Sequence, residues 1–152
     1  MANGKSASIQ YFWSAQDAVR TFRRLPEDLQ HALDETSRGI ATRTAGLISA
    51  AAAGESRQAA LVAPSIYAKF TGIPTVVAGG GMKVPGKQGL TSGDIFFGAN
   101  FGSYMYRQFP DQKIGDDYFF YDTLYGEAPR MVEEWSQAIA DVAEVFNAGG
   151  DD

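Results

Sequence analysis

Side chains able to do chemistry are few and scattered in this 152-residue chain. There is no cysteine, which excludes thiol catalysis, cysteine-ligated zinc and iron–sulfur clusters. The single histidine, His31, makes a histidine-based metal site or proton relay within one chain unexpected. Four aspartates lie close together in sequence, but they lack the alternating order and the final glutamate of a calcium loop. We interpret Asp111, Asp116, Asp117 and Asp122 as part of a solvated loop and predict no metal site.

A glycine-rich segment partly matches a phosphate-binding loop. Residues 81–87 read Gly-Met-Lys-Val-Pro-Gly-Lys and fit the first seven positions of that pattern. The eighth is Gln88, where a serine or threonine should bind magnesium, and no helix start follows to hold a phosphate. We therefore predict no cofactor. Since no serine lies in a nucleophile elbow either, we predict that the protein is not an enzyme.

Charge and hydropathy limit the partners. The net charge is −5, but residues 1–80 carry 8 basic and 6 acidic side chains, whereas residues 81–152 carry 5 and 12. This balance disfavours tight binding of nucleic acid, although DNA could pass without being held. No apolar run approaches the ~18 residues that a membrane helix needs, and residues 1–13 lack a secretory apolar segment. We expect a protein made in a cytoplasm that does not enter a membrane.

Two long helices should position the rest of the chain. Pro26, followed by Glu27 and Asp28, is typical of a helix start. Apolar residues then recur at helical spacing up to Gly54 and predict a helix of about 26 residues. A second helix is predicted to begin at Pro129 and to end before Gly149. The predicted core residues on these helices are Leu29, Leu33, Ile40, Leu47, Trp135, Ile139 and Val142.

The centre of the chain suggests a small sheet. A helical turn or two is expected around residues 57–62, then a strand at residues 73–78 with Val76 in the core, and another strand at residues 94–98. The six glycines and one proline of residues 79–93 predict a long mobile loop that buries little. The predicted fold class is α+β, with both long helices packed on one face of a small antiparallel sheet.

The predicted domain limits follow from this pattern. Residues 1–13 form a flexible N-terminal tail, residues 14–148 a single α+β domain, and residues 149–152 a flexible C-terminal tail. Within the domain, residues 14–25 predict a short amphipathic helix with Ala15, Ala18, Val19 and Phe22 on its apolar face.

Aromatic residues are concentrated in one region. Residues 96–125 hold 11 of the 19 aromatic side chains, more than one face of a small sheet can bury. Exposed aromatic patches usually mark interfaces, and arginine beside aromatics is typical of binding hot spots. The predicted interface comprises aromatics, one arginine and three residues of the glycine-rich loop: Phe96, Phe97, Phe101, Tyr104, Tyr106, Arg107, Phe109, Met82, Lys83 and Lys87.

The order of segments resembles a known family. VVAGGG, a Gly/Pro loop, GDIFFGANFGS, RQFP and a Trp-bearing helix (EEWSQAIADVAEVF) follow one another. This order is similar to that of the minor tail or tail-completion proteins of long-tailed bacteriophages, with Asn100 in place of a glutamate. The resemblance implies a virion structural protein at the head–tail junction, made in the host cytoplasm. It would form a homo-oligomeric ring, a hexamer in preference to a dodecamer, around a channel through which DNA passes without specific binding.

The partners implied by the resemblance are the neighbouring head-completion or portal-side proteins and the tail-terminator or tail-tube proteins. Two alternatives stay open at this point. One is a different neck component, such as a tail terminator, a head-closure protein or a portal adaptor. The other is a cellular module that binds a small ligand.

Overall fold

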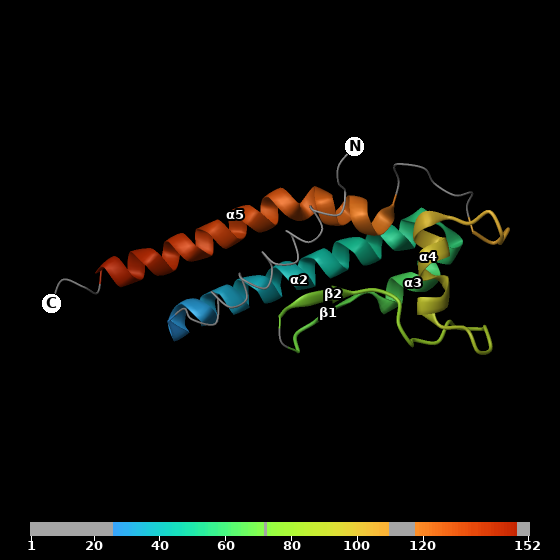
Figure 1. The fold of residues 1–152 in the computed structure, drawn as a ribbon, viewed down its shortest axis with the longest axis horizontal. Helices are drawn as coiled ribbons and strands as arrows, with labels where there is room; N and C mark the ends of the chain where they lie inside the picture. Colours follow the sequence, from blue (N-terminus) through green and yellow to red (C-terminus); the bar gives the residue numbers. More distant parts are fainter. Residues whose placement is uncertain (1–25, 72, 110–117, 149–152) are drawn as a thin grey trace, which may run out of the picture.

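The computed structural model describes residues 26–71, 73–109 and 118–148. The predicted tails and the helix predicted for residues 14–25 lie outside these residues. Helices dominate, and one small sheet completes an α+β fold, as predicted (Figure 1). The elements are α2 (Glu27–Glu55), α3 (Arg57–Val62), the 3₁₀ helix η1 (Ala63–Ser65), β1 (Tyr67–Lys69), β2 (Thr75–Val77), α4 (Ser92–Phe101) and α5 (Phe119–Ala148).

Helix α2 confirms the predicted first long helix. Pro26 is its N-cap, with an extended backbone (φ −50°, ψ 148°), and two acidic residues occupy its first turn. The buried face of its second half recurs every three or four residues: Ile40, Ala41, Thr44, Ala45, Ile48 and Ala52. Of the predicted core residues, Leu33 and Ile40 are buried and Leu29 is half-buried. The prediction for Leu47 is wrong: this side chain is 39% exposed because its position lies off that face.

Helix α5 begins ten residues earlier than predicted, at Phe119, so Pro129 lies inside it. A proline there removes one helical hydrogen bond, yet the helix continues because side chains support its start. The Asp122 carboxylate accepts a hydrogen bond from the Tyr118 amide (2.8 Å), and the Asn100 side-chain oxygen accepts one from the Phe120 amide (3.1 Å). These acceptors satisfy amides that have no partner within a helix.

The second half of α5 is less buried than predicted. Trp135 is 41% exposed and Ile139 is 47% exposed, so neither is a core residue, and Val142 is half-buried. This part of α5 lies against a single helix, α2, which leaves much of its apolar face open (Figure 1).

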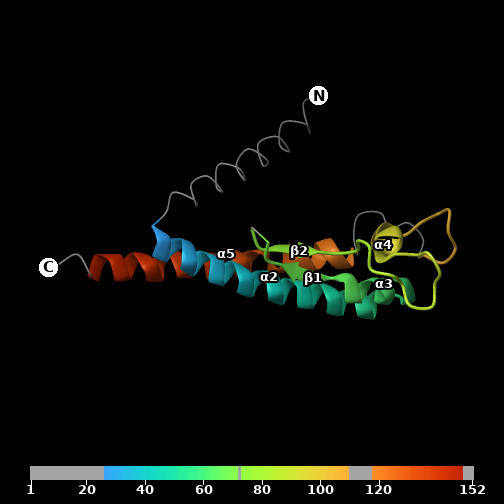
Figure 2. The ribbon, with the colours of Figure 1, turned by 90° about the horizontal axis from the view of Figure 1, so that it is seen from below.

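The sheet consists of β1 and β2, paired antiparallel with Tyr67 opposite Val77 and Lys69 opposite Thr75. Both strands lie along α2 (Figure 2). Helix α2 is therefore the central element, in contact with the sheet and with α5. Val76 is half-buried and packs against the core, and the strand predicted at residues 73–78 is present in shortened form.

The strand predicted at residues 94–98 is wrong, because these residues belong to α4. Thr91 and Asp94 form a capping box: the Asp94 carboxylate accepts from the Thr91 amide at 2.8 Å, and the Thr91 hydroxyl accepts from the Asp94 amide at 3.4 Å. The cap starts a helix despite the strand preference of the following Ile and Phe residues. Ile95 and Ala99 then join the main core beside Ile48 of α2.

The glycine-rich segment before α4 buries more than predicted. Val84 at its turn is only 2% exposed and belongs to the core. The Gly93 amide donates to the Gly80 carbonyl at 2.9 Å, and a Cβ on Gly93 would lie 2.9 Å from that same oxygen. Gly79 and Gly80 have φ of 81° and 79°, in the left-handed region that glycine adopts readily. The glycines therefore allow two backbone segments to touch.

Candidate interaction surface

Four aromatic rings form a continuous row across the junction of α4 and α5. Phe97 and Phe101 come from α4, and Tyr121 and Tyr125 come from α5. We call these four residues the aromatic row. Successive ring centroids along it lie 6.2, 5.9 and 6.3 Å apart, with interplanar angles of 17°, 30° and 28°. Each helix supplies two rings four residues apart, which places them on one helical face.

The row is exposed in a single chain, although its base is fixed. Phe97 and Tyr125, at its two ends, are each 69% exposed, and Tyr121 is also exposed. Phe101 is half-buried and meets the Tyr118 ring edge-on at 5.0 Å. Rings held in fixed positions lose little conformational freedom when a partner covers them, which favours binding.

The other face of α4 holds the row in place. Phe96 points to the interior, where its ring meets Phe119 and Phe120 edge-on at 6.2 and 5.7 Å. Asn100 is fully buried, and its bond to the Phe120 amide joins α4 directly to the start of α5. The two helices are therefore fixed relative to each other at the point where both present aromatic rings.

The structure divides the predicted interface residues into three groups. Phe97 and Phe101 lie in the row, and Tyr104, Tyr106 and Arg107 are exposed just after α4. Phe96 and Phe109 pack against the core instead. The exposed loop residues Met82, Lys83 and Lys87 precede α4, so they lie at its opposite end from Phe101.

Phe109 is inward-facing because of a single glycine. A Cβ on Gly98 would lie 2.6 Å from the Phe109 ring, so the ring rests directly on the backbone of α4. The chain after α4 therefore returns to the body of the protein at Phe109. The intervening Tyr104, Met105 and Tyr106 remain exposed next to the aromatic row in the sequence.

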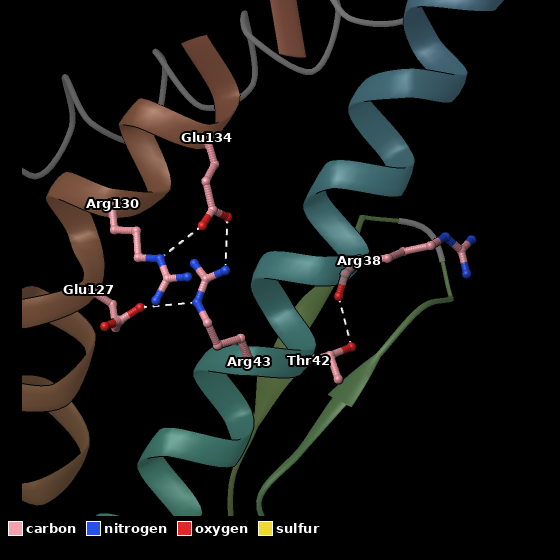
Figure 3. Close-up of polar contacts among 6 residues, drawn as sticks. All are labelled: Arg38, Thr42, Arg43, Glu127, Arg130 and Glu134. Carbon is pink, nitrogen blue, oxygen red and sulfur yellow. Dashed lines mark hydrogen bonds and ion pairs between the residues drawn. The ribbon is translucent and has the colours of Figure 1, made fainter. Parts of the chain in front are cut away.

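A group of ion pairs joins α2 to α5 away from the row (Figure 3). The Arg43 guanidinium donates to Glu127 (Nε–Oε2, 3.2 Å) and to Glu134 (Nη1–Oε2, 2.9 Å), and Arg130 also donates to Glu134 (2.9 Å). The hydrogen bond from Arg43, followed by that from Arg130, lowers the pKa of the Glu134 carboxyl, while desolvation opposes the shift. The bond to Glu134 is likewise the largest cause that raises the pKa of Arg43. The sequence reading treated Glu134 as an ordinary surface charge and missed this role.

An open apolar groove of about 710 Å³ lies between α2, β2 and α5. Ile40, Ala41 and Thr44 of α2 line it, together with Val76 of β2 and Trp135 and Ile139 of α5. It explains the exposure of the last two residues. Arg43 and Glu134 line a different, more polar hollow on the neighbouring face of the helix pair.

Chemically, this arrangement is suited to binding. Among the described residues, no three His, Asp or Glu side chains come together in a way that could hold a metal ion. No helix in the described ranges has the length and hydropathy to cross a membrane. No protein-family model matches the chain, and no curated protein or solved structure matches it significantly.

Proposed function

We propose that the protein is a virion structural protein of a long-tailed bacteriophage, located at the head–tail junction. It forms a ring that completes the tail and joins it to the DNA-filled head. The observation that carries the proposal is the aromatic row, whose rings are fixed by the fold and yet open to solvent. The order of sequence segments that resembles tail-completion proteins supplies the biological setting.

The row supplies one of the two surfaces that a ring needs. Each subunit of a cyclic ring offers two different patches, one to each neighbour. A partner that covers Phe97 and Tyr125 removes large apolar areas from water, at about 25 cal/mol per Å². Exposed Tyr104, Met105 and Tyr106 extend this apolar surface along the chain. Association through it would therefore be driven mainly by aromatic burial.

The acidic second half of α5 suits the passage of DNA. Residues 131–148 contain Glu133, Glu134, Asp141 and Glu144 and no basic side chain. A surface with this charge repels the phosphate backbone, so a channel that it lines would not hold the duplex. The protein has a structural and not a catalytic role in this proposal, as a hexamer in preference to a dodecamer, with head-side and tail-side neck proteins as its neighbours.

The test is the morphology of particles assembled without the protein. Electron micrographs should show filled heads beside tails that are unjoined or malformed. Normal, infectious particles would contradict an essential joining role. The axial position and symmetry of the ring in an intact particle would separate this role from that of a tail terminator, head-closure protein or portal adaptor.

One observation favours a second candidate, a module that binds a small apolar ligand. The groove between α2, β2 and α5, at about 710 Å³, falls within the size range of ligand pockets. Thermal stabilisation of a strictly monomeric protein by a metabolite would support this candidate over the ring.

A further inference from the structure

We propose that residues 9–25 of the same chain fold back along α2 and cover the apolar groove. The aromatic residues 11–13 would lie in the groove itself, and the amphipathic residues 14–25 would run between it and Pro26. This inference stands apart from the proposed function, because it concerns how one chain covers its own surface.

The groove needs an occupant of mixed character. Its lining is apolar apart from a few hydroxyls, and Trp135 and Ile139 remain 41% and 47% exposed beside it. One lining residue, Thr44, is 1% exposed, and its hydroxyl has no hydrogen-bond partner among the described residues. A buried unpaired hydroxyl is costly, so the occupant should bring a polar group as well as apolar area.

The segment that precedes α2 has this composition. Residues 9–13 read Ile-Gln-Tyr-Phe-Trp, and the tyrosine hydroxyl or the indole N–H could pair with Thr44. Ala15, Ala18, Val19 and Phe22 recur at helical spacing and give the next stretch one apolar face.

The chain must reverse direction close to Pro26. The residue before a proline is restricted to extended conformations, so a helix over residues 14–24 has to end there. Pro26 itself has an extended backbone at the N-cap of α2. Two helices joined by so short a connection form an antiparallel hairpin, in which residues 14–25 run back beside α2.

The length of this segment matches the distance to the groove. Ser37 lines the near end of the groove, eleven residues into α2 from Pro26, which corresponds to about 16 Å of helix. Twelve helical residues, 14–25, span about 18 Å. The hairpin therefore brings residues 11–13 to the level of Ser37 and Ile139, where the groove opens.

Charge complementarity supports the same placement. Residues 1–25 carry Lys5, Arg20, Arg23 and Arg24 against a single acid, Asp17. The second half of α5, which lines one wall of the groove, carries four acids and no base over residues 131–148. A basic segment next to this helix lowers the repulsion among its carboxylates.

Cross-linking of the full chain tests the placement directly. The protein has no cysteine, so Ser14→Cys with Ser136→Cys gives one defined pair, with Ser136 on the groove. The matched control joins Ser14→Cys to Asp141→Cys, at a similar height on α5 but on the polar hollow. With a short bismaleimide in dilute solution, we expect the groove pair to cross-link within the monomer at least five times more than the control.

Every other result overturns the proposal. Cross-links only between chains would mean that a second copy covers the groove, and equal yields for the two pairs would mean that the segment does not settle there. A second measurement uses the double substitution Phe12→Ser and Trp13→Ser in the full chain. Binding of a hydrophobic dye should rise severalfold relative to an Arg20→Ser control, and unchanged binding would count against the proposal.

Discussion

The two ends of the α2–α5 pair are held together by different forces. The aromatic end (residues 45–69, 79–109 and 118–125) contains every member of the main core cluster, from Ala45 to Phe119. In the far half (residues 27–44 and 126–148), no described side chain of α5 is fully buried, and ion pairs from Arg43 tie the helices together. The comparison indicates that the aromatic row stands on the most rigid part of the protein, whereas the groove lies where packing is incomplete.

The largest effect should follow from a cavity in the core of the aromatic end. Ile95 is 2% exposed and belongs to the cluster that holds α4 against α2 and α3. Ile95→Ala should lower the free energy of unfolding by about 2–5 kcal/mol. Urea denaturation measures this loss. A loss as small as that of Val132→Ala, at an exposed position of the far half, would remove the distinction between the two ends.

A smaller loss should result from separating the glycine-rich segment from α4. A Cβ on Gly93 meets the Gly80 carbonyl oxygen, so the backbone must shift in Gly93→Ala, at a cost of about 1–3 kcal/mol. Gly81→Ala is the matched control, because a Cβ there meets nothing within 4 Å. Equal melting temperatures for the two variants would show that this segment is not packed as described.

In the far half, Arg43→Met should destabilise by about 1 kcal/mol, since the ion pairs that it breaks are partly exposed. The loss should shrink as salt is added. Ile95→Ala should show no such salt dependence. A loss of Arg43→Met that is insensitive to salt would mean that its aliphatic stem, and not its charge, supports the helix pair.

The smallest effect concerns pH, and each end contributes one carboxyl. Hydrogen bonds from Arg43 lower the pKa of Glu134, and hydrogen bonds from Thr91 lower the pKa of Asp94. Because the unfolded chain takes up these protons first as pH falls, their stabilisation is complete above the ordinary values of 4.5 and 3.8 and is lost below them. Thermal melts of Glu134→Gln and Asp94→Asn should each show a weaker pH dependence in this range than the unsubstituted protein. An unchanged pH profile in either variant would contradict its hydrogen bonds.

Sequence patterns predicted the fold where a local signal and the tertiary packing agreed. Pro26 and the acidic first turn located α2, since the same residues act as N-cap and dipole partners in the structure. Helix α4 was missed because the strand preference of Ile95 and Phe96 was weighed above the capping signal of Thr91 and Asp94. The start of α5 was missed because its support comes partly from Asn100, on a different helix.

The candidate surface was predicted only in part for a similar reason. Local aromatic density correctly indicated exposure of Phe97, Tyr104 and Tyr106. The row also needs Tyr121 and Tyr125, and their partnership with α4 depends on how two helices pack. The spacing of four residues within each pair was the available signal. The inward turn of Phe109 depends on the contact with Gly98, which a single sequence does not reveal.

The central claim, that the aromatic row joins copies of this chain, is tested most directly by the native mass of the purified protein over a range of concentrations. The account predicts a closed ring, of six subunits in preference to twelve, which the double substitution Phe97→Ser and Tyr125→Ser reduces to monomers. Tyr67→Ser, at an exposed tyrosine on β1, is the control and should leave the ring intact. A protein that stays monomeric at every concentration, or a ring that the double substitution leaves unchanged, would contradict the account.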